Sequence, residues 1–148
     1  MLNRPLLATS ATLVVSAALV LVAATAAAEE VPVLGAKQQP LIVTRGFGNA
    51  HPRLILAGVP KGTGEKAWRL RWTGWGAATA HARGLTYRYG GYHYGRVAIE
   101  LRASRIGRCR RGGRRAYTFL EVRTAVRPGG RFDRWHAWLG WKNICGWH

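Results

Sequence analysis

Apolar and polar residues alternate with a period of two over most of the chain after residue 40, in short segments separated by glycine and proline. This period is typical of β-strands with one buried face, and no segment shows the 3.6-residue period of a helix. The alternation predicts strands over Leu41–Arg45, Arg53–Val59, Ala67–Trp72, Ala77–Tyr89, Tyr92–Ser104, Ala116–Val126 and Trp135–Trp141. We therefore expect an all-β fold, either a small antiparallel β-sandwich or a partly open barrel.

The segment WRLRWTGWG, which begins at Trp68, contains three of the seven tryptophans of the chain. In a regular strand Trp68, Leu70 and Trp72 point to one face, and the intervening arginines point to the other. We predict that Trp68 and Trp72 belong to the core. Trp75 follows Gly74, where the alternation ends, so the sequence leaves its direction open.

The segment TYRYGGYHYG predicts a β-hairpin with a two-residue Gly-Gly turn. This turn sets Tyr89 opposite Tyr92 and Tyr87 opposite Tyr94, and directly opposed residues share a face. The aromatic surface predicted from this register consists of Tyr87, Tyr89, Tyr92 and Tyr94. It either stacks against a flat ligand or is covered by another part of the protein.

The same register extends away from the turn and separates two faces of the hairpin. Ala82 lies opposite Ile99, as expected of a core face, and the other face carries a polar group of His81, Glu100 and Arg102. Alternation in the next strand adds further residues to the polar face: Tyr117, Phe119, Glu121 and Arg123. A bulge or a slip of one residue would invert part of this assignment.

The N-terminus has the pattern of a secretory signal peptide, with Arg4 before an apolar run that ends in three alanines. We expect cleavage after Ala28; retention of the segment as a membrane anchor is the alternative. The predicted organisation is a signal peptide over 1–28, a flexible leader over 29–39 and one β domain over 40–148. Secretion places the domain outside the cell or in the cell envelope, with no membrane span after cleavage.

Positive charge dominates the composition. The chain has 23 Lys and Arg against 6 Asp and Glu, and a formal net charge of +17. Removal of the signal peptide takes away Arg4 and no acidic residue, which leaves +16. A field of this sign attracts polyanions such as nucleic acid and acidic envelope glycans. The alternative is a general contribution to solubility.

The segment RIGRCRRGGRR concentrates this charge in the turn that follows a predicted strand. Its arginines are the predicted polyanion-binding residues: Arg105, Arg108, Arg110, Arg111, Arg114 and Arg115. Cys109 lies among them, and the second cysteine, Cys145, lies near the C-terminus. In an exported domain two cysteines predict one disulfide. In the tail we expect Trp135, Leu139 and Trp141 to face inward and Trp138 to face outward.

Catalysis is difficult to place in this chain. Ser104, the one serine after the predicted cleavage site, lacks the context of an activated nucleophile, and the histidines do not have metal-ligand spacing. We expect no catalytic residue, no metal and no cofactor. The remaining enzymatic alternative is a small basic ribonuclease, in which His81, Glu100 and Arg102, with His93 and the tyrosines nearby, would together supply an acid, a base and a cation for the phosphate.

Four segments, WTGWGAATAHARG, YGGYHYGRVAIEL, CRRGGRRAYTFLEVR and WLGWKNICG, resemble small secreted β-proteins of high-GC Gram-positive bacteria. The resemblance implies a secreted β domain and assigns no functional residue. The sequence thus predicts a secreted, non-catalytic protein that binds an anionic polymer, either a cell-envelope glycan or a nucleic acid. A protein–protein interaction module, such as an inhibitor or a toxin-like partner, is the alternative.

Overall fold

One curled β-sheet forms the protein. The computed structural model describes residues 28–37, 43–58, 64–88 and 95–146, and the predicted signal peptide lies almost entirely outside them. The elements are β1 (Val33–Leu34), β2 (Val43–Arg45), β3 (Leu54–Gly58), β4 (Gly64–Thr73), β5 (Thr79–Arg88), β6 (Gly95–Arg108), β7 (Arg115–Thr124), β8 (His136–Ala137) and the short 3-10 helix η1 (Trp138–Gly140). These described residues contain no α-helix. The all-β prediction is therefore confirmed.

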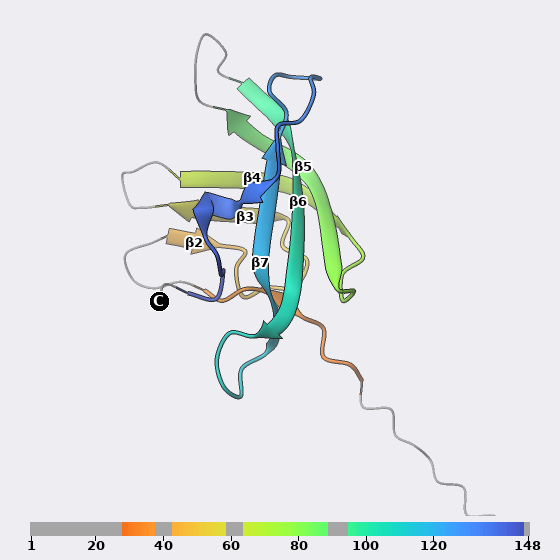
Figure 1. Ribbon diagram of the computed structural model, residues 1–148, viewed down its shortest axis with the longest axis vertical. Helices are drawn as coiled ribbons and strands as arrows, with labels where there is room; N and C mark the ends of the chain where they lie inside the picture. The colour runs from red at the N-terminus through yellow and green to blue at the C-terminus, as the bar shows by residue number, and fades with distance from the viewer. Residues whose placement is uncertain (1–27, 38–42, 59–63, 89–94, 147–148) are drawn as a thin grey trace, which may run out of the picture.

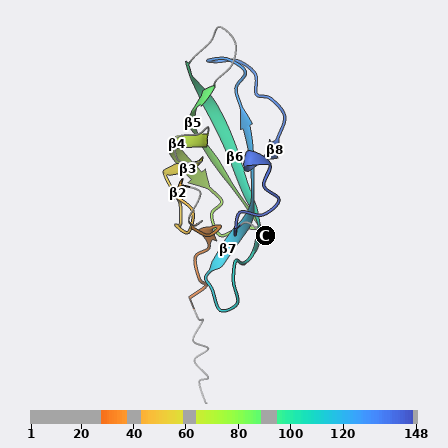
Figure 2. The same ribbon diagram turned by 90° about the vertical axis from the view of Figure 1, so that its left-hand side faces the viewer.

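Strands β2 to β7 form an antiparallel meander in which each strand pairs with the next along the chain. Two short strands complete the sheet at the β7 edge: β1 pairs parallel to β7 and β8 pairs antiparallel to it. In Figure 1 the long strands β5, β6 and β7 run vertically and β2 to β4 run across them. The sheet thus curls into a half-barrel, which is the partly open barrel of the two predicted architectures (Figure 2).

The N-terminal segment differs from the predicted flexible leader. Pro32, Val33 and Leu34 are buried. The Leu34 amide donates to the Asn49 carbonyl over 2.9 Å, and the Trp75 indole nitrogen donates to the Pro32 carbonyl over 2.8 Å. A two-residue strand is too short to produce a periodic sequence signal, which is why the alternation did not predict β1.

The core lies on the concave face of the sheet. Small residues of β5 pair with larger residues of β6 on this face: Ala82 lies opposite Leu101 and Gly84 opposite Ile99. These four residues are buried or half-buried, as the predicted core face requires. The register nevertheless differs from the prediction by two residues, because Tyr87 pairs with Arg96 and not with Tyr94. A shift of two residues preserves the faces of both strands and changes only the partners.

A bulge in β4 overturns the prediction that Trp68 belongs to the core. Trp68 pairs with Leu85, but the register then shifts, and Arg69 adopts a positive φ of 54°. The extra residue sends Leu70 into the core and leaves Trp68 on the convex face. Gly84 lies opposite the bulge, where a Cβ would stand 2.6 Å from the Trp68 carbonyl oxygen. A glycine at that position is therefore required by the bulge.

The prediction for Trp72 is correct, and Tyr117 joins it on the core side. The Trp72 ring packs edge-on against Trp75, with 4.7 Å between their centroids, and Trp75 contacts Tyr117 in the same way at 5.1 Å. Tyr117 is fully buried, and its hydroxyl donates to the Ala77 carbonyl over 2.7 Å. The predicted exposed position of Tyr117 is wrong. The pairing of β6 with β7 omits Arg105, whose φ is 59°, and beyond it Ile106 and its partner Tyr117 both pack on the core side without a shift of register.

The C-terminal tail also reverses the predicted arrangement of its tryptophans. Trp138 is fully buried, whereas Leu139 is one of the exposed large apolar residues. The predicted strand ends after two residues, and Leu139 takes a positive φ of 50° inside η1. Trp138 belongs to the core cluster at this turn, and Trp141 packs against the same cluster as expected.

Glu65, in β4, is a half-buried carboxyl that lies near His136 and Leu139 of the tail. Burial raises the pKa of Glu65, and neither nearby His136 nor the Leu139 amide offsets that effect. Because the folded-state pKa lies above the value in the unfolded chain, the folded state binds the proton more tightly. Stability should therefore fall as pH rises through the folded pKa.

The variant Glu65→Gln keeps the shape of the side chain and cannot ionise. We expect it to melt at a higher temperature than the wild type at neutral pH and at the same temperature below about pH 4, where the wild-type carboxyl is protonated too. Calorimetry across this pH range measures the difference. A wild type that is more stable than the variant at neutral pH would contradict this interpretation.

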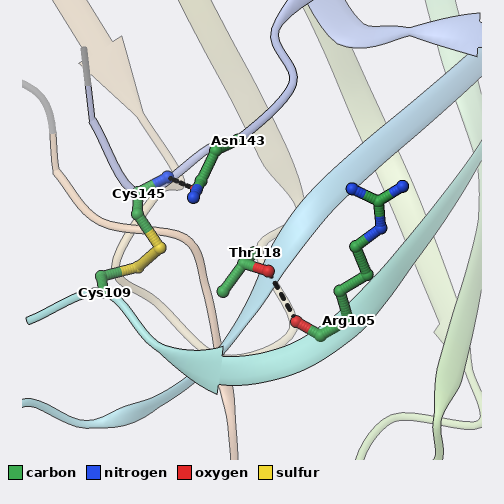
Figure 3. The surroundings of a disulfide bond; sticks show 5 residues. All are labelled: Arg105, Cys109, Thr118, Asn143 and Cys145. Atoms are coloured by element: carbon green, nitrogen blue, oxygen red, sulfur yellow. Dashed lines mark hydrogen bonds between the residues drawn. A yellow bond between two sulfur atoms is a disulfide. The ribbon is translucent and has the colours of Figure 1, made fainter. Parts of the chain in front are cut away.

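The disulfide between Cys109 and Cys145 is present, as predicted. It joins the residue after β6 to the C-terminal segment (Figure 3). The neighbouring Ile144 is fully buried. The Ile144 amide donates to the Thr118 carbonyl over 2.8 Å, and its carbonyl accepts from the Ala36 amide over 3.1 Å. The disulfide thus lies where β6, β7, the tail and the N-terminal segment meet.

Candidate anion-binding surface

The candidate site is the convex face of β5, β6 and β7, together with the turn between β6 and β7. Alternate residues of each strand point to this face, and the cross-strand pairs align them in rows. His81 lies opposite Arg102, and Arg83 lies opposite Glu100. The predicted polar group of His81, Glu100 and Arg102 therefore shares one face. Its partners differ from the prediction because of the two-residue shift in register.

Two carboxylates hold three arginines in place on this face. The Glu100 carboxylate accepts from Arg83 Nε over 2.9 Å and from Arg123 Nε over 2.7 Å. Glu121 accepts two hydrogen bonds from Arg102, of 2.5 and 2.8 Å. These bonds hold the pKa of Glu121 below its usual range, with a smaller opposite effect from burial. Each guanidinium carries five N–H donors, so donors remain after these contacts.

Aromatic rings lie over the same guanidinium groups. The Trp135 ring centroid is 4.7 Å from the guanidinium carbons of both Arg102 and Arg123, and Arg105 lies 4.1 Å from the Phe119 ring. Contacts of this kind are favourable because the π face carries negative charge. The rings and the arginines are therefore ordered together before any ligand arrives.

A second aromatic group lies at the start of β6. Tyr87 is 47% exposed, and its ring centroid is 4.6 Å from that of Trp68. Lys66 Nζ lies 5.6 Å from the Trp68 ring, and Arg96 is exposed opposite Tyr87. Tyr87 thus lies on an accessible aromatic surface. The other predicted members, Tyr89, Tyr92 and Tyr94, lie outside the described residues.

The arginine-rich turn is shorter than predicted, since β6 continues through Arg108 and β7 begins at Arg115. Arg108 and Arg114 form ion pairs with Glu30, at 3.5 and 3.9 Å. Arg115 forms an ion pair with Glu29. The N-terminal acidic residues therefore lie against the arginine cluster.

Arg110 and Arg111 differ from the other arginines of the turn. Both are exposed, and neither forms an ion pair with any residue that the structure describes. They occupy the turn directly after Cys109, where the Gly113 amide donates to the Arg110 carbonyl over 2.9 Å. The turn therefore presents two uncompensated positive charges from a hydrogen-bonded, disulfide-tethered backbone.

The turn and the tyrosine lie at opposite ends of β6. Arg96 is near the first residue of the strand and Arg108 is the last. At about 3.3 Å per residue the strand spans roughly 40 Å. The sequence predicted the arginine-rich turn and the aromatic surface that contains Tyr87, but not the distance between them. The rows of Arg83, Arg102 and Arg123 lie between the two ends and connect them.

Sequence reasoning placed Phe119, Glu121 and Arg123 on this face and missed Trp135, Glu29 and Glu30. The tail alternation pointed Trp135 inward, but its ring lies over the convex face. A signal for the two glutamates was present, because they are two of only six acidic residues in the chain. Scarce acids beside abundant arginines are expected to be paired.

The ion pairs of Glu100 argue against the ribonuclease alternative. Arg83 and Arg123 occupy both oxygens of Glu100, which leaves that carboxylate committed to ion pairs. Among the described residues no group of three His, Cys, Asp or Glu side chains is arranged to hold a metal ion.

Comparisons with protein-family models, with curated proteins and with solved structures gave no match. Within the described residues no helix is long and apolar enough to span a membrane.

Proposed function

We propose that the protein is a secreted, non-catalytic binding protein for an anionic polymer, a cell-envelope glycan or a nucleic acid. One observation carries the proposal: Arg83, Arg102 and Arg123, from three neighbouring strands, lie together on the convex face and are held there by Glu100 and Glu121. A fixed group of cations that continues toward the arginine-rich turn suits a repeating anionic chain. The guanidinium groups pair with phosphate, sulfate or carboxylate.

The proposed site contains two kinds of arginine, those held in place by other side chains and those without an ion-pair partner among the described residues. Arg102 and Arg123 are fixed between carboxylates and the Trp135 ring, so they offer their remaining donors in set positions. Arg110 and Arg111 supply uncompensated charge at the turn. The exposed Tyr87 ring suits stacking against a sugar or a base.

The test is retention of the oxidised, secreted protein on heparin, RNA, DNA and purified cell-wall polymer across a salt series. The variant Arg110→Ala/Arg111→Ala should elute at lower salt, with the slope of log affinity against log salt reduced by about two, one unit for each lost anion contact. The matched control is Arg45→Ala/Arg53→Ala, which removes the same charge from the opposite edge of the sheet, at β2 and before β3. Equal losses in both variants would indicate generic charge and contradict a defined site.

The same measurement separates the alternative functions. An interface with a protein partner depends on aromatic contacts, so binding should persist in salt and be lost in Tyr87→Ala. A ribonuclease would degrade the RNA, and His81→Ala would abolish the degradation. Intact RNA after incubation would exclude that activity for this substrate.

A further inference from the structure

The N-terminal acidic pair occupies the arginine cluster of the proposed site. Glu30 bridges Arg108 and Arg114, and Glu29 contacts Arg115. In Figure 1 the orange N-terminal segment passes beside the lower ends of β6 and β7. Arg108, Arg114 and Arg115, in the turn and at the strand ends beside it, therefore have carboxylates of the same chain as their partners.

The segment is anchored directly after these glutamates. Pro32 is buried and accepts the hydrogen bond from Trp75, and β1 begins at Val33. Glu30 is therefore tethered within three residues of a fixed strand, and its effective concentration at the arginines is high. The position of the acidic pair follows from β1 docking and does not depend on strong ion pairs.

The ion pairs themselves are easily displaced. The side chain of Glu29 is 78% exposed and that of Glu30 is 39% exposed. Exposed pairs of this kind contribute little free energy and weaken further in salt. An anionic polymer that also contacts Arg110, Arg111 and the convex face makes contacts that the two glutamates cannot make.

We propose that Arg108, Arg114 and Arg115 form an anion-binding site whose internal occupant is the Glu29–Glu30 pair, and that a carboxylate-bearing glycan displaces this pair when it binds. A uronate carboxylate has the same chemistry as the present occupant, and the aromatic rings of the same face suit the sugar rings between successive carboxylates. The inference rests on the proposed function, since it describes the regulation and ligand class of that site.

The test compares the secreted, oxidised protein with its Glu29→Gln/Glu30→Gln variant on polygalacturonate, with mass spectrometry to confirm the N-terminal residue. Removal of the internal competitor should tighten binding about two- to tenfold. The substitution also raises the net charge by two, so the same change is made in an Arg108→Gln/Arg114→Gln/Arg115→Gln background, which lacks every arginine that contacts the pair. In that background the gain should disappear, whereas a generic charge effect would persist.

Carboxyl-carbon NMR signals supply a readout that does not depend on affinity. Added polygalacturonate should shift the side-chain carboxyl signals of Glu29 and Glu30 toward their positions in the Arg108→Gln/Arg114→Gln/Arg115→Gln background, and leave the hydrogen-bonded Leu34 amide protected. A gain in affinity of equal size in both backgrounds, or unchanged carboxyl signals of Glu29 and Glu30, would overturn the inference, while binding by the wild type would still support the proposed function. If no form of the protein binds any polyanion, the proposed function itself fails. Tighter binding to RNA than to polygalacturonate in the Gln variant would assign the site to nucleic acid instead.

Discussion

Replacement of Trp138 by alanine is expected to lower the free energy of unfolding by about 3–5 kcal/mol, the usual cost of removing a large aromatic side chain from a protein core. Trp138 is fully buried and belongs to the main hydrophobic cluster, although it follows a two-residue edge strand. Its indole nitrogen has no hydrogen-bond partner in the described part of the chain, so burial of the ring alone accounts for its contribution. Urea denaturation of the oxidised protein measures the loss.

Trp135→Ala is the matched control, because it removes the same side chain three residues earlier in the tail. The Trp135 ring lies on Arg102 and Arg123 at the convex face, where each such contact is worth about 0.5–1 kcal/mol. We expect a stability loss well below that of Trp138→Ala, together with weaker polymer binding. Equal losses of stability in the two variants would contradict the assignment of Trp138 to the core and Trp135 to the surface.

Removal of the disulfide in Cys109→Ser/Cys145→Ser should lower the free energy of unfolding by about 2–4 kcal/mol. The cysteines are 36 residues apart in sequence, so the bond restricts a long loop of the unfolded chain. In the folded protein it holds the tail against β6 beside the buried Ile144. Denaturation in the presence and absence of a reductant should show a shift for the wild type and none for the variant.

The Cys109→Ser/Cys145→Ser substitution should also weaken polyanion binding by the arginine-rich turn. Arg110 and Arg111 follow Cys109 directly, so loss of the disulfide leaves them on a less restricted backbone. We expect weaker retention on polyanions even where the variant remains folded.

For stability, an unchanged denaturation midpoint in the double serine variant would contradict the prediction. It would show that packing of the tail holds the C-terminal segment in place without the disulfide.

The sequence alone determined the strands and the faces of the central hairpin. Alternation located strands at β2 to β8, and small residues opposite aliphatic ones identified the core face of β5 and β6. These inferences succeeded because the side-chain period of a strand is local, so an error of two residues in register left each residue on its correct face. The disulfide followed from there being only two cysteines.

Tertiary structure decided the positions that depend on a single irregular residue or on distant segments. A bulge at Arg69 placed Trp68 outside, and residues of positive φ lie across the pair from buried Tyr117, at Arg105 in β6, and directly after buried Trp138, at Leu139. One extra residue in a bulge changes the face of the side chains on one side of it, and the local pattern does not record it. The contact of Glu29 and Glu30 with the arginine turn likewise arises only because β1 docks on β7, a long-range pairing of two residues that leaves no periodic trace in the sequence.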